Sequence, residues 1–125
     1  MNGTALTPLE RQLAALVAAR AALQPASERV WVFGSRARGA STEFSDLDIA
    51  VEFSVPGSPE LRRWLDCLRV ETEAPVADQW PGFVNLTGLF AEDADSRLLH
   101  RVREEGLLVW ARQPSSASLA SLFER

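Results

Sequence analysis

A strand, a small-residue turn and a second strand constrain the fold of this chain more than any other feature. Val30–Phe33 is a run of β-branched and aromatic residues that suits a buried strand, and Gly34-Ser35 follows it directly. After ten more residues comes Asp46, and Leu47–Phe53 then alternates with a period of two. The pattern predicts two strands joined by a glycine-serine turn and a short connection, the second beginning with two aspartates.

The turn and the aspartates have the chemistry of a phosphate and metal site. A glycine turn lets a ligand approach the backbone, where free N–H groups and the Ser35 hydroxyl can hold phosphate oxygens. Asp46 and Asp48 are two residues apart on the expected strand, so their carboxylates face one side, roughly 7 Å apart. Carboxylates beside phosphates suit Mg²⁺. Arg36 and Arg38 add positive charge next to the turn.

Composition and charge exclude several classes of protein. The chain has 125 residues, enough for one domain with a core, and its net charge of -4 argues against non-specific binding of nucleic acid.

Cys67 is the only cysteine, so we expect no intrachain disulfide and a reducing, cytoplasmic location, with Cys67 in the core. We find no signal-peptide pattern and no apolar stretch long enough to span a membrane, so no membrane association is expected.

The first helix is expected over residues 8–24. Thr7 and Glu10 form a capping box, and Pro8 takes the first helical position. Its apolar stripe consists of Leu9, Leu13, Leu16, Val17 and Leu23. The stripe most simply packs in the core, but the alanines at 14, 15, 18, 19, 21 and 22 would also allow close approach of a partner helix.

The remaining pattern alternates helix and strand. We expect a second helix capped by Ser58, a strand over 83–86, a third helix over 94–105 and a short strand over 107–110. The residues expected to face inward are Leu61, Trp64, Leu65 and Leu68 on the second helix, and Leu98, Leu99 and Val102 on the third. Arginines 62, 63 and 69 are expected on the exposed face of the second helix.

Two ionisable residues outside the motif are assigned to the surface. Glu52 shares a strand face with Asp48, and exposure to solvent is the ordinary state of a strand glutamate. His100, the only histidine, lies among arginines with no second histidine or cysteine nearby, which speaks against a metal site.

The motif resembles that of the minimal nucleotidyltransferases of the DNA polymerase beta superfamily, often called MNT. Their hallmark is glycine-serine, about ten residues, then aspartate-x-aspartate, which stands here as Gly34-Ser35 and Asp46-Leu47-Asp48. The resemblance covers residues 8–110, and 111–125 form a polar extension. It implies an α/β (α+β) fold: a small mixed β-sheet with helices packed mainly on one face.

The resemblance also implies a reaction. These proteins transfer a nucleoside monophosphate from a nucleoside triphosphate, here most simply AMP from ATP, to a hydroxyl group, with two metal ions on the attacking and leaving oxygens. By analogy, the nucleotide-binding residues are Gly34, Ser35, Arg36 and Arg38, and the ligands of Mg²⁺ are Asp46 and Asp48.

One position departs from the family pattern. The family usually has a third aspartate on the following strand, and aligning Phe83–Leu86 with that strand places Asn85 there. An asparagine oxygen is neutral, binds Mg²⁺ less well than a carboxylate and cannot act as a base. Asp78, the nearest carboxylate upstream, lies outside the strand pattern.

Two functions follow from these observations. The resemblance implies an antitoxin that modifies a HEPN-domain toxin by adding AMP. The alternative is a catalytically weakened nucleotide-binding module that neutralises such a partner by contact alone, which Asn85 and the alanine-rich helix favour. A third reading, a globular domain with an incidental acidic pair, requires the whole motif to have arisen by chance.

Overall fold

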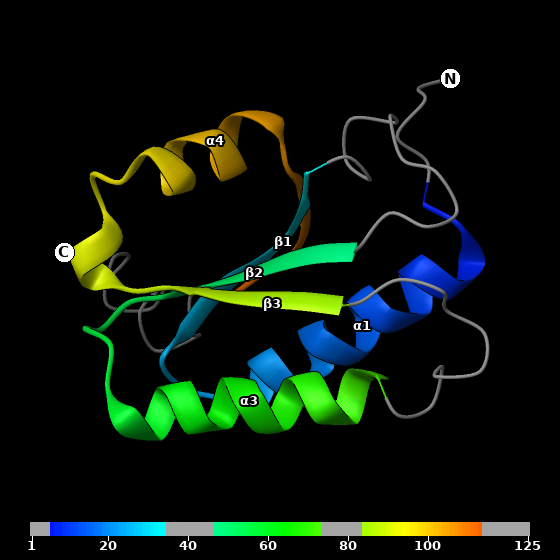
Figure 1. The fold of residues 1–125 in the computed structure, drawn as a ribbon, viewed down its shortest axis with the longest axis horizontal. Coiled ribbons are helices and arrows are strands. Elements are labelled where there is room, and N and C mark those ends of the chain that lie inside the picture. Colours follow the sequence, from blue (N-terminus) through cyan, green and yellow to red (C-terminus); the bar gives the residue numbers. More distant parts are fainter. Residues whose placement is uncertain (1–5, 35–46, 74–83, 114–125) are drawn as a thin grey trace, which may run out of the picture.

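Four strands form one sheet flanked by helices, as the ribbon in Figure 1 shows. The computed structural model describes residues 6–34, 47–73 and 84–113. In chain order the elements are α1 (Pro8–Leu23), β1 (Ser27–Phe33), β2 (Leu47–Phe53), α3 (Pro59–Glu73), β3 (Val84–Leu89), the 3₁₀ turn η2 (Ala91–Asp93), α4 (Arg97–Glu105) and β4 (Leu107–Ala111). The expected succession of helices and strands is confirmed, with β3 extending three residues beyond its predicted end at 86.

The sheet is mixed, in the order β3-β2-β1-β4. β1 pairs antiparallel with both β2 and β4, and β2 pairs parallel with β3. Val32 lies opposite Ile49 in the β1–β2 pair, and Ile49 lies opposite Leu86 in the β2–β3 pair. Side chains in register therefore line up across the sheet and divide its residues between two faces.

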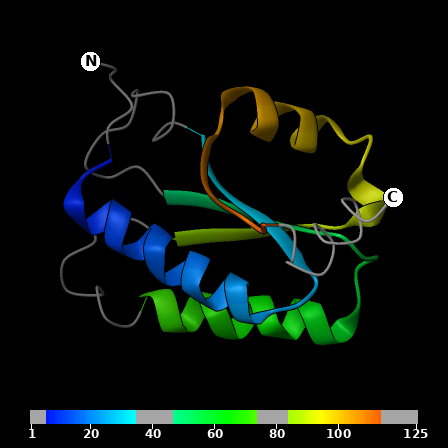
Figure 2. The ribbon, with the colours of Figure 1, turned by 180° about the vertical axis from the view of Figure 1, so that it is seen from behind.

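Helices α1 and α3 cover one face of the sheet, as the two opposite views in Figures 1 and 2 show. The larger hydrophobic core lies on this face. Its buried members include Leu13 and Val17 from α1, Leu65 and Leu68 from α3, and Val30, Val32, Ile49 and Val51 from the sheet. The period-two pattern of β2 directs its apolar residues to this face. Burial of these side chains is the main stabilising contribution to the fold.

Helix α4 covers the opposite face of the sheet (Figure 2). A smaller core forms there from Ala50, Leu89, Leu99 and Val102, with Trp31 and Phe33 packed against it. The expectation of a mixed sheet with helices mainly on one face is confirmed, and α4 is the helix on the other face. This second layer covers the same side of β2 that bears Asp48.

The helix starts follow their capping residues. In α1 the capping box is complete, because Glu10 N–H donates to Thr7 Oγ1 at 3.2 Å and Thr7 N–H donates to Glu10 Oε1 at 2.7 Å. Ser58 caps α3 as predicted, accepting from the N–H of Leu61 at 3.2 Å.

Helix α4 begins at Arg97, three residues after the predicted start at 94. Residues Ala91–Asp93 form the 3₁₀ turn η2, and Ala94 and Asp95 continue as a turn instead of starting the helix. The Asp93 carboxylate accepts from the N–H of Phe90 at 2.9 Å. Ser96 then caps α4 by accepting from the N–H of Leu99 at 3.1 Å. The prediction missed the start because these side-chain bonds favour a tight turn before the helix.

Three side chains that were predicted to be buried are exposed. Leu23 ends α1 and is 77% exposed, and Leu98 is 37% exposed because Leu99 and Val102 occupy the inner side of α4. Cys67 is exposed as well. The buried stripe of α3 consists of Leu61, Leu65, Leu68 and Thr72, spaced by four, three and four residues. Cys67 lies off this stripe, so the helical pattern places it outside the core.

Candidate functional site

Gly34 follows the last residue of β1 and adopts a left-handed backbone conformation, with φ of 75°. A Cβ at this position would collide with the carboxylate of Asp48. Both the backbone conformation and the close approach therefore require glycine. The carboxylate of Asp48 on β2 therefore lies against the turn that follows β1.

Asp48 lies between two neighbours in the sheet. It faces Phe33 of β1 in the antiparallel pair and Asn85 of β3 in the parallel pair. The Asn85 Nδ2 group donates a hydrogen bond to Asp48 Oδ1 at 3.1 Å. Asn85, the residue that we expect at the third acidic position, is therefore in contact with Asp48.

The other predicted site residues lie outside the described residues. These are Ser35, Arg36, Arg38, Asp46 and the weighed alternative Asp78. Their roles remain predictions from the motif.

The described residues fit a hard cation at one carboxylate. Asp48 is half-buried and supplies the oxygen donors that Mg²⁺ prefers. Among residues 6–34, 47–73 and 84–113, no group of three or more histidine, cysteine, aspartate or glutamate side chains could hold a metal ion. Asn85 presents its amide nitrogen to Asp48, and a nitrogen donor group cannot bind a cation.

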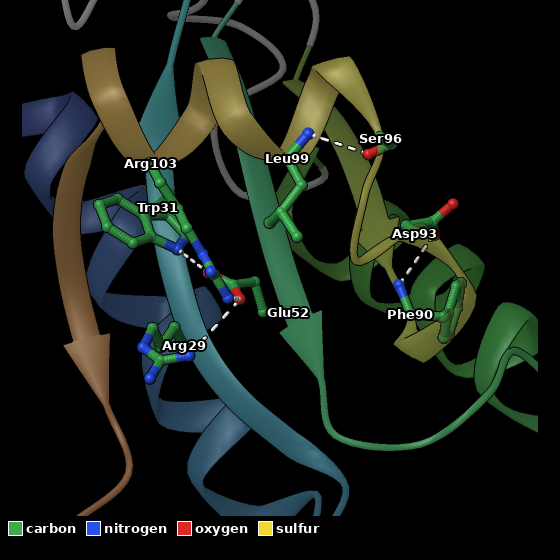
Figure 3. A network of polar contacts seen from close by, with 8 residues as sticks. All are labelled: Arg29, Trp31, Glu52, Phe90, Asp93, Ser96, Leu99 and Arg103. Atoms are coloured by element: carbon green, nitrogen blue, oxygen red, sulfur yellow. Dashed lines mark hydrogen bonds and ion pairs between the residues drawn. The ribbon is translucent and has the colours of Figure 1, made fainter.

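Glu52 is buried, and the prediction of a solvent-exposed glutamate was wrong. The residue is only 5% exposed and lies under α4. Its carboxylate accepts a hydrogen bond from Trp31 Nε1 and forms ion pairs with Arg103 Nη2 at 2.7 Å and Arg29 Nη1 at 3.5 Å (Figure 3). The bond to Glu52 raises the pKa of the Arg103 guanidinium above its usual value. The carboxylate is buried together with the donors that satisfy it.

Sequence patterning gave one usable signal for this network. It correctly placed Glu52 on the same face of β2 as Asp48, but nothing local indicated that α4 covers that face. His100, by contrast, is exposed as expected. The arginines at 62, 63 and 69 are exposed on α3 as expected too.

The model of the polymerase beta nucleotidyltransferase family matches residues 19–115, which is most of the chain. The chain belongs to the polymerase beta nucleotidyltransferase family. The family match spans the turn at Gly34, both strands beside it and Asn85. No curated protein matches the chain.

Solved structures share this nucleotidyltransferase fold. A toxin-antitoxin complex with AMP-PNP has 18% identity over 89% of this chain and 86% of the other, with a TM-score of 0.55. A variant of the MntA-HpeT toxin-antitoxin pair has 20% identity over 96% and 88% of the two chains, also with a TM-score of 0.55. The complex of tri-AMPylated Shewanella oneidensis HEPN toxin with MNT antitoxin has 18% identity over 90% and 79%, with a TM-score of 0.50.

A shallow groove runs along α1 beside β4, on the nucleotidyltransferase domain's outer surface. It is lined by Leu6, Arg11, Ala14, Ala15, Ala18, Ala19, Ala22, Val109 and Trp110. Five of the residues that line it are alanines of α1, whose small side chains would allow close approach of a neighbouring chain. In the part of the chain that the structure describes, no helix combines the length and apolarity needed to cross a lipid bilayer.

Proposed function

We propose that this chain transfers AMP from ATP to a hydroxyl group of a HEPN-type partner protein, as an MNT antitoxin. The observation that carries the proposal is the contact between the left-handed turn at Gly34 and the Asp48 carboxylate. Such a turn exposes backbone N–H groups to phosphate oxygens next to a carboxylate suited to Mg²⁺. Similar folds in a complex with AMP-PNP and in a complex with a tri-AMPylated HEPN toxin support the choice of nucleotide and partner.

The proposed roles follow the motif. The turn at Gly34 and Ser35 binds the triphosphate, Arg36 and Arg38 neutralise its charge, and Asp46 and Asp48 hold Mg²⁺. Mg²⁺, when bound, stabilises the negative charge that develops on the reacting phosphoryl group.

In the proposed transfer, the acceptor oxygen bonds to the α-phosphorus while the bond from that phosphorus to the β-phosphate bridging oxygen breaks. Pyrophosphate leaves and the hydroxyl proton passes to water. Asn85 has no basic group to accept that proton, and a general base typically contributes 10²–10⁴-fold. We therefore expect weak transfer.

A labelling experiment tests this function. The chain is incubated with its HEPN partner, Mg²⁺ and ATP labelled at the α-phosphate, and label on the partner is measured. Wild type should label the partner slowly, and Asp48→Asn should abolish the label. Asp66→Asn is the matched control, because Asp66 is an exposed aspartate on α3 whose contact with Arg69 is a weak surface pair. Absence of label with wild type, or label that persists in Asp48→Asn, would contradict the proposal.

The alternative function is neutralisation of the partner by contact alone. The hydrogen bond from Asn85 to Asp48 supports this alternative, because the residue that we expect at the third acidic position turns a neutral N–H donor toward Asp48. The groove along α1 offers a surface for such contact. Asn85→Asp separates the two functions: a gain in AMP transfer with unchanged partner affinity would mean that binding and chemistry are independent in this chain.

The groove is tested by charge insertion. Ala15 is exposed on α1, so Ala15→Glu should leave folding intact while weakening partner binding at least tenfold. Ala94→Glu is the control, because Ala94 is an exposed alanine outside the groove. Equal partner affinity of both variants, measured by calorimetry, would exclude the groove as the contact surface.

A further inference from the structure

The two carboxylate oxygens of Asp48 face different strands. Oδ1 accepts the hydrogen bond from Asn85 on β3 at 3.1 Å. Oδ2 is the atom nearest to the position that a Cβ on Gly34 would take, next to β1. Because β2 lies between β3 and β1, the carboxylate has one oxygen toward each neighbour.

The register brings Asn85 directly beside Asp48 in the parallel pair. A carboxylate at position 85 would place two negative charges in this contact, and they would repel each other unless a cation lay between them. The amide instead donates an N–H to Oδ1. Its nitrogen has to face Asp48, because its oxygen would repel the carboxylate.

We propose that the Asn85 amide takes the place of a second cation, so that the chain binds a nucleoside triphosphate with one divalent cation, held on the Oδ2 side of Asp48. This inference rests on the nucleotide binding proposed above. Two-metal chemistry needs a second cation roughly 3.5–4 Å from the first, and therefore further oxygen ligands beside Asp48. Here the hydrogen bond occupies the Oδ1 side.

Counting bound Mn²⁺ tests the inference without measuring catalysis. Free Mn²⁺ is followed by electron paramagnetic resonance during titration of the chain saturated with an ATP analogue that has a methylene group between the α- and β-phosphates. Wild type should bind one Mn²⁺ per nucleotide complex. Asn85→Asp should bind two, because the new carboxylate restores a ligand and removes the amide donor.

The matched control is Thr87→Asp. Thr87 lies two residues along β3 on the same face, but it is paired with Ala50 instead of Asp48, so a carboxylate there should leave the count at one. Thermal unfolding confirms that each variant is folded. Two Mn²⁺ ions in the wild-type complex, or one in the Asn85→Asp complex, would overturn the inference.

The same titration without nucleotide separates this inference from the proposed function. Wild type should bind Mn²⁺ at least tenfold more weakly than Asn85→Asp under these conditions. Failure of the analogue to bind either protein would contradict the proposed function, while the affinity difference for Mn²⁺ would still decide the role of Asn85. Equal Mn²⁺ affinity of wild type and Asn85→Asp without nucleotide would overturn the proposed role of Asn85.

Discussion

Arg103 of α4 donates a hydrogen bond to Glu52 of β2 at 2.7 Å, and this charged contact joins the helix to the sheet. Helix α4 covers the face of the sheet that also bears Asp48, which lies four residues before Glu52 on β2. Arg29 and Trp31 from β1 complete the set of donors around the same carboxylate. The Glu52 carboxylate therefore joins α4, β1 and β2 on the face of the sheet that bears Asp48.

Removal of the guanidinium by Arg103→Met should destabilise the fold. The Glu52 side chain is 6% exposed, so the loss leaves a buried carboxylate with fewer donors, whereas the Arg103 side chain is 51% exposed, which limits the cost. We expect the free energy of unfolding to fall by about 1–2 kcal/mol in urea titrations. Arg101→Met, at an exposed arginine of the same helix, is the control. Equal losses in both variants would mean that the Glu52 contact contributes nothing specific.

Gly34→Ala should destabilise the fold although it adds only a methyl group. The positive φ of 75° disfavours an L-residue by about 1–2 kcal/mol, and the new Cβ would also push against Asp48. We expect a lower melting temperature and weaker nucleotide binding. Gly57→Ala is the matched control, because Gly57 has no positive φ and a Cβ there would meet the flexible ends of the Arg62 and Glu92 side chains. If both substitutions have the same effect on melting, the turn conformation at Gly34 is not required.

The contact between Glu92 and the loop before α3 should make stability depend on acid pH. Gly57 N–H donates to Glu92 Oε1 at 2.9 Å, and this bond, more than the nearby Arg62, lowers the pKa of Glu92 below 4.5. Because the pKa is lower in the folded state, the stabilisation is present above pH 4.5 and is lost as the pH falls through the folded value.

Glu92→Gln measures this dependence. The variant should be less stable than wild type in urea titrations at about pH 6, and the difference should shrink at about pH 3.5. Glu104→Gln, at an exposed glutamate of α4, is the control. A difference between wild type and Glu92→Gln that grows as the pH falls would contradict the sign of the lowered pKa.

The exposed Cys67 should react with thiol reagents in the native protein. It is the only cysteine, so mass spectrometry after treatment with iodoacetamide should show one added group without denaturant. Cys67→Ser should remain unmodified. Modification that requires unfolding of the wild-type protein would restore the original prediction of a core cysteine.

Local patterns were enough to predict most of the elements. The alternation in Leu47–Phe53 gave β2 with its ends unchanged, and the Thr7 capping box and Ser58 gave the starts of α1 and α3. These signals are local because they depend on bonds and periodicities within a few residues. The predicted burial of Leu23 and Leu98 was wrong because an apolar residue on a helix is buried only where another element covers it.

The sequence by itself determined the elements beside the site, the glycine turn after β1 and the fold class, since each follows from short-range chemistry. Only the tertiary structure decided that Asn85 donates to Asp48 and that Glu52 is buried with Arg103. Both contacts join residues far apart in the chain. They depend on the register between β2 and β3 and on the face that α4 covers, and packing of the whole sheet decides both.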